Sequence, residues 1–322
     1  MATKTTDRRT AARRLEHIVI ECVTPVLDGG RHAVKRVVGD DVVVGADVIK
    51  EGHDLLSARV LYRGPGDSAW SAAPMTFDYD SDRWYGTFQV DRVGEWAFAV
   101  EAWTDRFGTW RAGLEKKIAA NQDVQLELSE GARMARAASR STKSPTARAS
   151  LQRTARMLDD RRDTAIEKQL QRAVDDDLLA LMREHSRPND ATQPEREYTI
   201  VVDRPIARFA AWYEMFPRSQ TKPGPGAAPR HGTFDDAAAR LPRIAELGFD
   251  GVSLPPIHPI GRSHRKGKNN ALAAEPDDVG SPWAIGNEQG GHTAIDPALG
   301  TIDDFDRFVA TARDMDLEVA LD

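Results

Sequence analysis

The segment TIDDFDRFVATARDMDLEVALD, residues 301–322, decides the fold class because it joins a capped helix directly to a short apolar strand. Thr301 is the predicted N-cap, and Asp304 stands three residues later, as a capping box requires. An earlier segment, TFDDAAARLPRIAELGFDGVSLPPI at residues 233–257, repeats the order of cap, helix and strand. With ARFAAWYEMF at residues 207–216 as a preceding strand, this alternation predicts parallel βαβ units with right-handed crossovers.

The connections from strand to helix in this region are long, and the second runs from Pro256 to Gly300. Loops of that length inside a compact domain are usually functional. In a (β/α)₈ barrel the strand-to-helix loops build the active-site face, and a complete barrel needs about 250 residues. We therefore expect residues 207–322 to form the first three strands of a truncated (β/α)₈ barrel.

Residues 16–111 predict an antiparallel β-sandwich, because short segments rich in β-branched residues alternate there with turns. YTIVVDRP returns to strand, so we expect residues 197–206 to complete the same domain. The alternation of Trp96, Phe98 and Val100 indicates a core face. Five tryptophans lie in this region, and core packing is the favoured interpretation, with an exposed sugar-stacking platform as the alternative.

Residues 112–187 predict a helical insert in which Ala, Arg, Leu, Gln and Asp dominate. Two earlier helices are separated by STKSP, and residues 161–185 continue with apolar side chains at helical spacing. Acidic residues are interleaved with the arginines, so a salt-bridged bundle is favoured over an RNA-binding surface. Its thin apolar stripes suggest packing against the sandwich or a second subunit. Residues 1–15 are expected to form a disordered tail.

The composition of the 322 residues, 40% apolar and 29% charged with a net charge of −6, is that of an ordinary globular protein. Nothing in it indicates binding to nucleic acid or to a membrane surface. The single cysteine, Cys22, excludes an internal disulfide framework and suits a reducing compartment. No signal peptide or membrane span is recognisable, so a cytoplasmic location is expected.

The segment HPIGRSHRKGKNN, residues 258–270, concentrates positive charge at the start of the longest loop. Lysine and arginine at the carboxyl end of a strand can neutralise and orient an anionic ligand, and asparagine can donate to hydroxyl groups. A merely solvated charge cluster is the alternative interpretation. The basic residues are Arg262, Arg265, Lys266 and Lys268.

Other polar groups are weaker candidates. His258, His264 and His292 fit no tight metal-ligand spacing, so no metal site is expected. Asp277 and Asp278 are interpreted as acceptors that hold a loop in place. The glycines of PGPGAAP do not follow a strand at phosphate-loop spacing, and no nucleotide or other cofactor is expected.

Several segments of the second half resemble the α-amylase superfamily. They are WYEMFPRS, LPRIAELGFDGVSLPPIHPIG and IDPALGTIDDFDRFVATARDMDLEVALD. The longer segment RKGKNNALAAEPDDVGSPWAIGNEQGGHTAIDP is similar to the α-1,4-glucan:maltose-1-phosphate maltosyltransferases of glycogen-like glucan synthesis. Many amylases have a glycine-tyrosine pair where this chain has Gly291-His292, a departure that argues against an ordinary hydrolase.

This resemblance implies retaining transfer of a maltosyl unit from α-maltose 1-phosphate to the non-reducing end of an α-1,4-glucan. It implies a homodimer that pairs through the sandwich and its helical insert. The nucleophile and the acid/base are expected beyond residue 322, so no residue here is assigned a catalytic role and a chain ending there is expected to be inactive. Lys266 matches a lysine that contacts the donor, with Asn270 beside it, and Asp322 matches the aspartate that begins the first conserved region. Arg262, Arg265, Lys268 and Asp322 are further candidates for substrate binding.

Two alternatives remain open. The first is a hydrolase or isomerase of the same superfamily, such as an α-amylase or a trehalose synthase. The second is a carbohydrate-binding or dimerisation module without catalysis. Release of phosphate from maltose 1-phosphate separates the transferase from the first, and retention on glycogen through exposed tryptophans tests the second.

Overall fold

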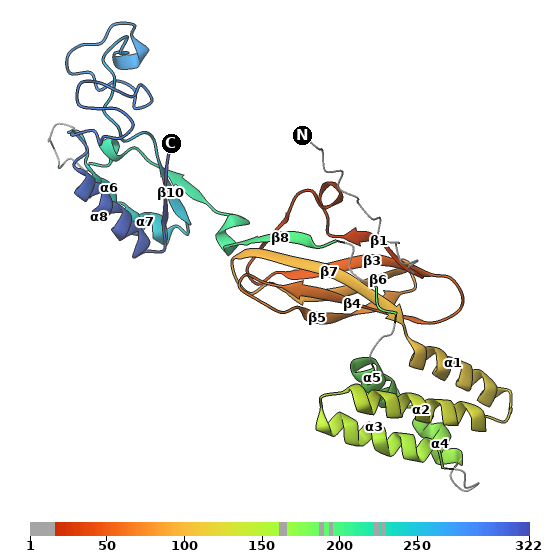
Figure 1. The fold of residues 1–322 in the computed structure, drawn as a ribbon. Helices are drawn as coiled ribbons and strands as arrows, with labels where there is room; N and C mark the ends of the chain where they lie inside the picture. The colour runs from red at the N-terminus through yellow and green to blue at the C-terminus, as the bar shows by residue number, and fades with distance from the viewer. Residues whose placement is uncertain are drawn as a thin grey trace, which may run out of the picture. The chain divides into compact units, whose positions relative to one another are not determined.

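The structure, a computed structural model, describes residues 17–160, 166–186, 190–192, 196–221, 224, 226 and 230–322. The chain divides into two compact units, Met1–Arg204 and Pro205–Asp322 (Figure 1). The tail predicted at residues 1–15 lies outside the described residues, as do parts of the predicted linker and of the PGPGAAP segment.

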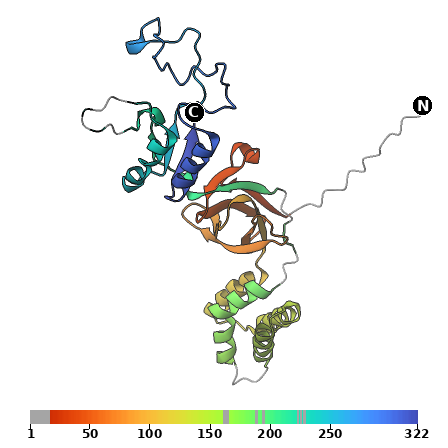
Figure 2. The ribbon, with the colours of Figure 1, turned by 90° about the vertical axis from the view of Figure 1, so that its left-hand side faces the viewer.

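The first unit contains an eight-stranded sheet, and the order of its strands is β1-β3-β6-β5-β4-β7-β8-β2. Its strands are β1 (Ile18–Thr24), β2 (Val34–Val37), β3 (Asp41–Lys50), β4 (Leu56–Arg63), β5 (Ser71–Asp78), β6 (Arg83–Gln89), β7 (Gly94–Thr104) and β8 (Tyr198–Asp203). Neighbouring strands are antiparallel, except that β2 and β8 are parallel. Figure 2 shows that this single sheet curls around its own interior. The sequence predicts the strands, but the hydrogen bonds join them in one sheet rather than in two separate layers.

The interior of the curl is the core of this unit. Trp96, Phe98 and Val100 are exposed by only 3%, 0% and 4%, which confirms the core face predicted for β7. Full burial of a side chain such as Phe98 contributes about 2–3 kcal/mol. The other four tryptophans of this region, Trp70, Trp84, Trp103 and Trp110, are partly buried. Partial burial of all four favours packing over an open sugar-stacking platform.

The described chain between β7 and β8 contains five helices. They are α1 (Arg106–Ala119), α2 (Gln125–Ser141), α3 (Pro145–Leu158), α4 (Ile166–Ala173) and α5 (Asp176–His185). The break predicted at STKSP separates α2 from α3, as expected from the proline at the first turn of α3. The pattern across residues 161–185 divides into α4 and α5, because Asp175 caps a new helix by accepting a hydrogen bond from the Asp177 N–H at 2.9 Å.

Helix α1 begins at Arg106, whereas the sequence predicts β structure as far as residue 111. The reason is Asp105, an N-cap whose side chain is 5% exposed. Its Oδ1 accepts a hydrogen bond from the Gly108 N–H at 2.8 Å, and its Oδ2 accepts one from Arg183 Nε of α5 at 2.8 Å. A capped first turn thus outweighs the aromatic residues that suggested a strand, and the helical region starts at residue 106 rather than 112.

The chain returns from the helices along the end of β7. Thr192 and Ala102 exchange two hydrogen bonds, from Thr192 N–H to Ala102 O at 2.9 Å and from Ala102 N–H to Thr192 Oγ1 at 3.1 Å. Asp190 accepts a hydrogen bond from the hydroxyl of Thr104, the last residue of β7. The points where the chain leaves and re-enters the sheet therefore lie beside each other.

Trp110 of α1 lies against α2 at Gly131. The indole Nε1 donates to Glu127 O at 2.9 Å, and a Cβ on Gly131 would lie 2.4 Å from the indole ring. Glycine inside a helix is about 1 kcal/mol less favourable than alanine, so its presence here reflects this close approach.

Gly131→Ala is expected to destabilise the unit by about 1–2 kcal/mol, because overpacking at Trp110 exceeds the gain in helix propensity. Urea denaturation measures the difference. The matched control is Gly113→Ala in α1, where a Cβ would meet nothing within 4 Å. Gly113→Ala is expected to raise the free energy of unfolding by about 0.5–1 kcal/mol. If both variants changed the free energy of unfolding in the same direction, the role given to Trp110 would be contradicted.

The second unit is built on a three-stranded parallel sheet in the order β11-β10-β9. Its elements are β9 (Trp212–Glu214), α6 (Phe234–Ala238), α7 (Leu241–Glu246), β10 (Gly251–Leu254), α8 (Ile302–Arg313) and β11 (Glu318–Leu321). The alternation and the parallel pairing confirm the βαβ prediction for this region. None of the helices in the described ranges has the length and apolar character needed to cross a bilayer.

The two predicted capping boxes are present. Thr233 and Asp236 form one at α6, and Thr301 and Asp304 form the other at α8. Behind them Phe234 and Phe308 are 0% and 1% exposed, with ring centroids 6.2 Å apart. Each capped helix therefore contributes a buried phenylalanine to a shared core, Phe234 from the first turn of α6 and Phe308 from the middle of α8.

Candidate functional site

The candidate site lies in the second unit, where the loops that follow the parallel strands meet. The carboxyl ends of parallel strands lie at the same edge of a sheet, and ligands bind at this edge in many α/β proteins. The loop after β9 leads to α6, and the loop after β10 runs to α8 and contains the basic segment at residues 258–270.

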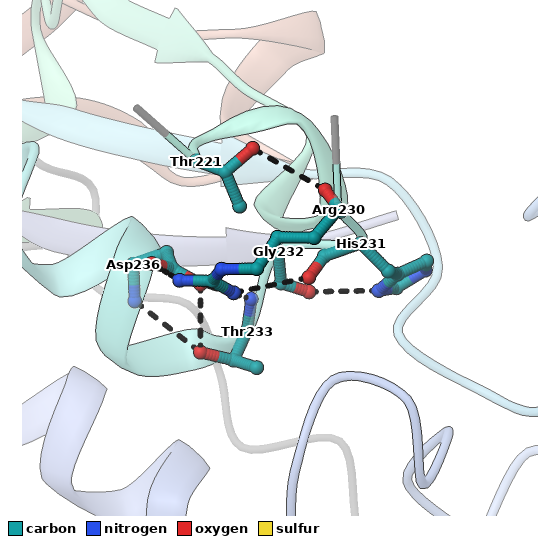
Figure 3. Close-up of polar contacts among 6 residues, drawn as sticks. All are labelled: Thr221, Arg230, His231, Gly232, Thr233 and Asp236. Atoms are coloured by element: carbon teal, nitrogen blue, oxygen red, sulfur yellow. Dashed lines mark hydrogen bonds and ion pairs between the residues drawn. The ribbon is translucent and has the colours of Figure 1, made fainter. Parts of the chain in front are cut away.

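The return of the first loop is held by Arg230. Its guanidinium donates two hydrogen bonds to the Asp236 carboxylate, at 2.8 and 2.6 Å, and Thr233 shares the same carboxylate (Figure 3). The hydrogen bonds from Arg230 hold the pKa of the Asp236 carboxyl below its ordinary value, against the smaller opposing effect of burial. Asp236 is thus a negatively charged helix cap that orders the loop, and it is not a candidate for acid catalysis.

His231 is presented on the other side of this loop. Figure 3 shows its ring pointing away from Asp236, and its Nδ1 lies 2.8 Å from Gly232 O. Gly232 permits no side chain, because a Cβ there would lie 2.3 Å from Pro217 O. This close approach of Gly232 to the backbone at Pro217 fixes the position of His231. The sequence analysis did not single out His231.

Three of the four basic side chains in the segment have partners. Arg262 pairs with Glu288 at 2.7 Å. Lys268 Nζ lies 3.6 Å from Asp277 Oδ2 and 3.7 Å from Asp278 Oδ1. Both pairs include well-exposed groups, so each contributes little to stability.

Arg265 is held differently from its neighbours. Its guanidinium donates to three backbone carbonyls: Nε to Gly261 O at 3.0 Å, Nη1 to Asp278 O at 2.9 Å and Nη2 to Ile260 O at 3.0 Å. Three of the five N–H donors of Arg265 are therefore occupied by backbone carbonyls of the same loop.

Lys266 differs from all three. Its side chain is exposed, and its ammonium group makes no ion pair or hydrogen bond with any residue that the structure describes. The structure therefore leaves one cation of the basic segment available for a ligand, and it is the lysine to which the sequence gave first place.

Two other predicted residues are also placed in the second unit. Asn270 is exposed and closes the short turn Lys268–Asn270 with a φ of 63°. Asp322 accepts a hydrogen bond from Trp283 Nε1, and the Trp283 ring lies edge-on to Phe216 with a centroid distance of 5.8 Å. Trp283 thus ties the second loop to the ends of β9 and β11, a connection that the sequence analysis missed.

A groove of about 520 Å³ runs beside the basic segment. It brings together Arg262 and Arg265 with Asn287, Gln289 and Asp296, whereas Lys266, Lys268, Asn270 and Asp322 do not line it. Polar and apolar side chains share the lining, since Ile260 and Val279 also border the groove. Of the predicted set, two residues therefore line the groove, three lie elsewhere on the same loop, and Asp322 follows β11.

A smaller hollow of about 20 Å³, room for about one water molecule, lies under the first loop. Arg218, His231, His258 and Asp296 contribute polar groups to it. Burial lowers the pKa of the Arg218 guanidinium, and the charge of Asp296 opposes this shift. Arg218 Nη1 donates to Gly280 O at 3.1 Å. Arg218 belongs to WYEMFPRS, and its position directly after a predicted strand was the available signal.

The histidines considered as metal ligands lie in two places. His258 and His292 are near each other, with ring centroids 5.7 Å apart, and His258 Nδ1 contacts Ala294 O at 2.8 Å. Within the described ranges, no three histidine, cysteine, aspartate or glutamate side chains are grouped so that they could hold a metal ion.

Comparison with known sequences gives a consistent result. The sequence profile of α-1,4-glucan:maltose-1-phosphate maltosyltransferase, domain N/S, matches residues 16–204. The enzyme of that name from Myxococcus xanthus is 47% identical over 96% of this chain, and the one from Chlorobaculum tepidum is 44% identical over 98%. The one from Mycobacterium tuberculosis H37Rv is 41% identical over 95% of the chain. The chain spans 46%, 46% and 47% of the lengths of these relatives.

Comparison with solved structures finds an α-amylase from Lactobacillus plantarum, 31% identical over 35% of this chain and 21% of that protein, with a TM-score of 0.27.

Proposed function

Since the chain belongs to the α-1,4-glucan:maltose-1-phosphate maltosyltransferase family, we propose that it supplies the N-terminal domains and part of the donor site of such an enzyme. The proposed reaction transfers a maltosyl unit from α-maltose 1-phosphate to the non-reducing end of an α-1,4-glucan, with retention of configuration. The relatives with this name match almost the whole of the chain, which supports the proposal.

The observation that carries the proposal is the available ammonium group of Lys266. Within the part of the chain that the structure describes, the neighbouring cations Arg262 and Lys268 pair with carboxylates, and Arg265 donates to backbone carbonyls. A sugar phosphate carries between one and two negative charges near neutral pH, and an unpaired lysine is a suitable point charge for it. Asn270, in the adjoining turn, is proposed to donate to a donor hydroxyl.

The catalytic carboxylates are proposed to come from the part of the family's length that follows residue 322. Retaining transfer needs a nucleophilic carboxylate and an acid/base about 5 Å apart. The carboxylates around the basic segment serve other purposes: Asp278 is buried and holds the loop, and Asp322 accepts from Trp283. They are well suited to shaping a site rather than to breaking a glycosidic bond.

The finer architecture belongs to the same proposal. Residues 16–105 and 197–206 would form a sandwich-type domain with residues 106–187 as its helical insert, and residues 207–322 would open a (β/α)₈ barrel. The parallel order β9, β10, β11 supports the barrel. We also propose pairing of two copies through the first unit, and a cytoplasmic location that a single cysteine suits.

The test measures inorganic phosphate released from α-maltose 1-phosphate in the presence of glycogen, using a polypeptide that carries residues 1–322 together with the catalytic carboxylates proposed above. Phosphate release in step with glucan lengthening by maltosyl units is the expected result. Hydrolysis of starch without any phosphate-dependent lengthening would overturn the proposal in favour of an amylase-type hydrolase. Conversion of maltose to trehalose would indicate the isomerase.

A further inference from the structure

We infer that Arg265 is a positioning residue, which fixes the loop of residues 261–280 so that Lys266 faces the donor. This inference rests on the proposed function for the role of Lys266, but the loop geometry is independent of it. The three carbonyls bound by Arg265 come from both ends of the loop, Ile260 and Gly261 at its start and Asp278 near its end. One side chain therefore closes the loop on itself.

A second arginine holds the same turn from another direction. Arg218, in the loop after β9, donates to Gly280 O at 3.1 Å, two residues from the carbonyl bound by Arg265. Gly280 has a φ of 74°, and a Cβ there would lie 3.1 Å from Cγ and Nε of Arg265. Only glycine allows the turn to approach the guanidinium this closely without strain.

The residue on the other side of Lys266 is also held. Gly267 N–H donates to Ala271 O at 2.9 Å, and a Cβ on Gly267 would lie 2.3 Å from Ala273 O and 3.0 Å from Asp278 Oδ2. The Asp278 carboxylate in turn accepts from the Glu275 N–H at 2.8 Å. The backbone of Lys266 is thus anchored at both neighbouring residues while its side chain stays available.

The contacts require arginine rather than a generic cation. The planar guanidinium presents donors in three fixed directions, and each of three carbonyls takes one of them. A lysine has one ammonium group on a flexible stem and cannot reach all three at once. Arg265→Lys is therefore expected to behave like Arg265→Met, although it keeps the charge.

A double-mutant cycle in the same polypeptide as in the phosphate-release test, which carries residues 1–322 together with the proposed catalytic carboxylates, tests whether Arg265 acts through Lys266. Arg265→Met and Lys266→Met are each expected to raise the KM for α-maltose 1-phosphate, by about 10-fold and by about 10- to 100-fold, with little change in kcat. The double variant is expected to be no worse than Lys266→Met alone. Additive effects would overturn the inference, because they would mean that Arg265 contacts the donor itself.

Amide hydrogen exchange tests the loop without reference to activity. Arg265→Met is expected to speed exchange at the Gly267 and Asp278 N–H groups, which donate to Ala271 O and Glu275 O. Gly280→Ala, which displaces Arg265 and keeps its charge, should have the same effect and serves if Arg265→Met folds poorly. The matched control is Arg243→Met, whose side chain makes an exposed pair with Glu246 in α7.

The two measurements separate the possible failures. Unchanged exchange at Gly267 in both Arg265→Met and Gly280→Ala would overturn the positioning role and leave the proposed function standing. An unchanged KM in Lys266→Met would instead remove donor binding by Lys266, and with it the inference that Arg265 positions Lys266 for the donor.

Discussion

Asp105→Ala is expected to lower the free energy of unfolding of the Met1–Arg204 unit by about 3 kcal/mol. Two losses add: the N-cap of α1, worth about 1 kcal/mol, and a charge-assisted hydrogen bond from Arg183 to a buried carboxylate, worth about 1.5–3 kcal/mol. The side chain is only 5% exposed, so water cannot easily take the place of either partner. For a unit of this size the melting temperature should fall by about 6 to 12 °C, measured by calorimetry.

Two variants make the Asp105 result specific. Asp105→Asn keeps an oxygen that can cap the helix but loses the charge. Its free energy of unfolding should lie between those of the wild type and of Asp105→Ala. Asp176→Ala removes a carboxylate that pairs with Arg111 at 2.8 Å but is 91% exposed, and should change stability by less than about 0.5 kcal/mol. If Asp105→Ala is as mild as Asp176→Ala, the Asp105 carboxylate does not stabilise α1 and its contact with α5 as described.

Lys266→Met is expected to lower kcat/KM for α-maltose 1-phosphate by about 10- to 100-fold. Under the proposed function the lost contact is a charge-assisted one with the bound donor, worth about 1.5–3 kcal/mol, so KM should rise while kcat changes little. Initial rates of phosphate release over a range of donor concentrations measure both constants.

Lys116→Met is the control for Lys266, because Lys116 is an exposed lysine of α1 in the other unit. Its kinetic constants should match those of the wild type. A change of less than twofold in Lys266→Met would show that the ammonium group is only solvated, which is the alternative that the sequence left open.

Features that depend on near neighbours were predictable. The two capping boxes need only a threonine, an aspartate three residues later and an apolar run, and both Thr233 and Thr301 begin helices as expected. The strands of the second unit follow from the same alternation, because a helix between two strands carries the chain back so that the second strand pairs parallel to the first.

Features that depend on distant partners were not. The place of β7 between β4 and β8 is set by pairing across the chain, which an alternating pattern cannot specify. The start of α1 was missed because the aromatic residues after Asp105 suggested a strand. The available signal was Asp105 itself, since aspartate is one of the residues preferred at a helix N-cap.

The candidate site divides in the same way. The sequence identified a basic segment at the end of a strand, but it could not tell which cation would remain available. That depends on Glu288 reaching Arg262, on acidic residues near Lys268, and on three carbonyls that meet at Arg265 only when the loop is folded.

The chain leaves the sheet at Thr104 and rejoins it beside Ala102, through Asp190 and Thr192. A segment that starts and finishes at adjoining points adds little closure entropy as it lengthens, about 0.6 kcal/mol for each doubling. The stability of the sheet therefore depends little on the length of the segment inserted between these points. Changes in the length of residues 106–185 are therefore expected to cost the sheet little, and variation in length among relatives is expected to occur there rather than in the sheet.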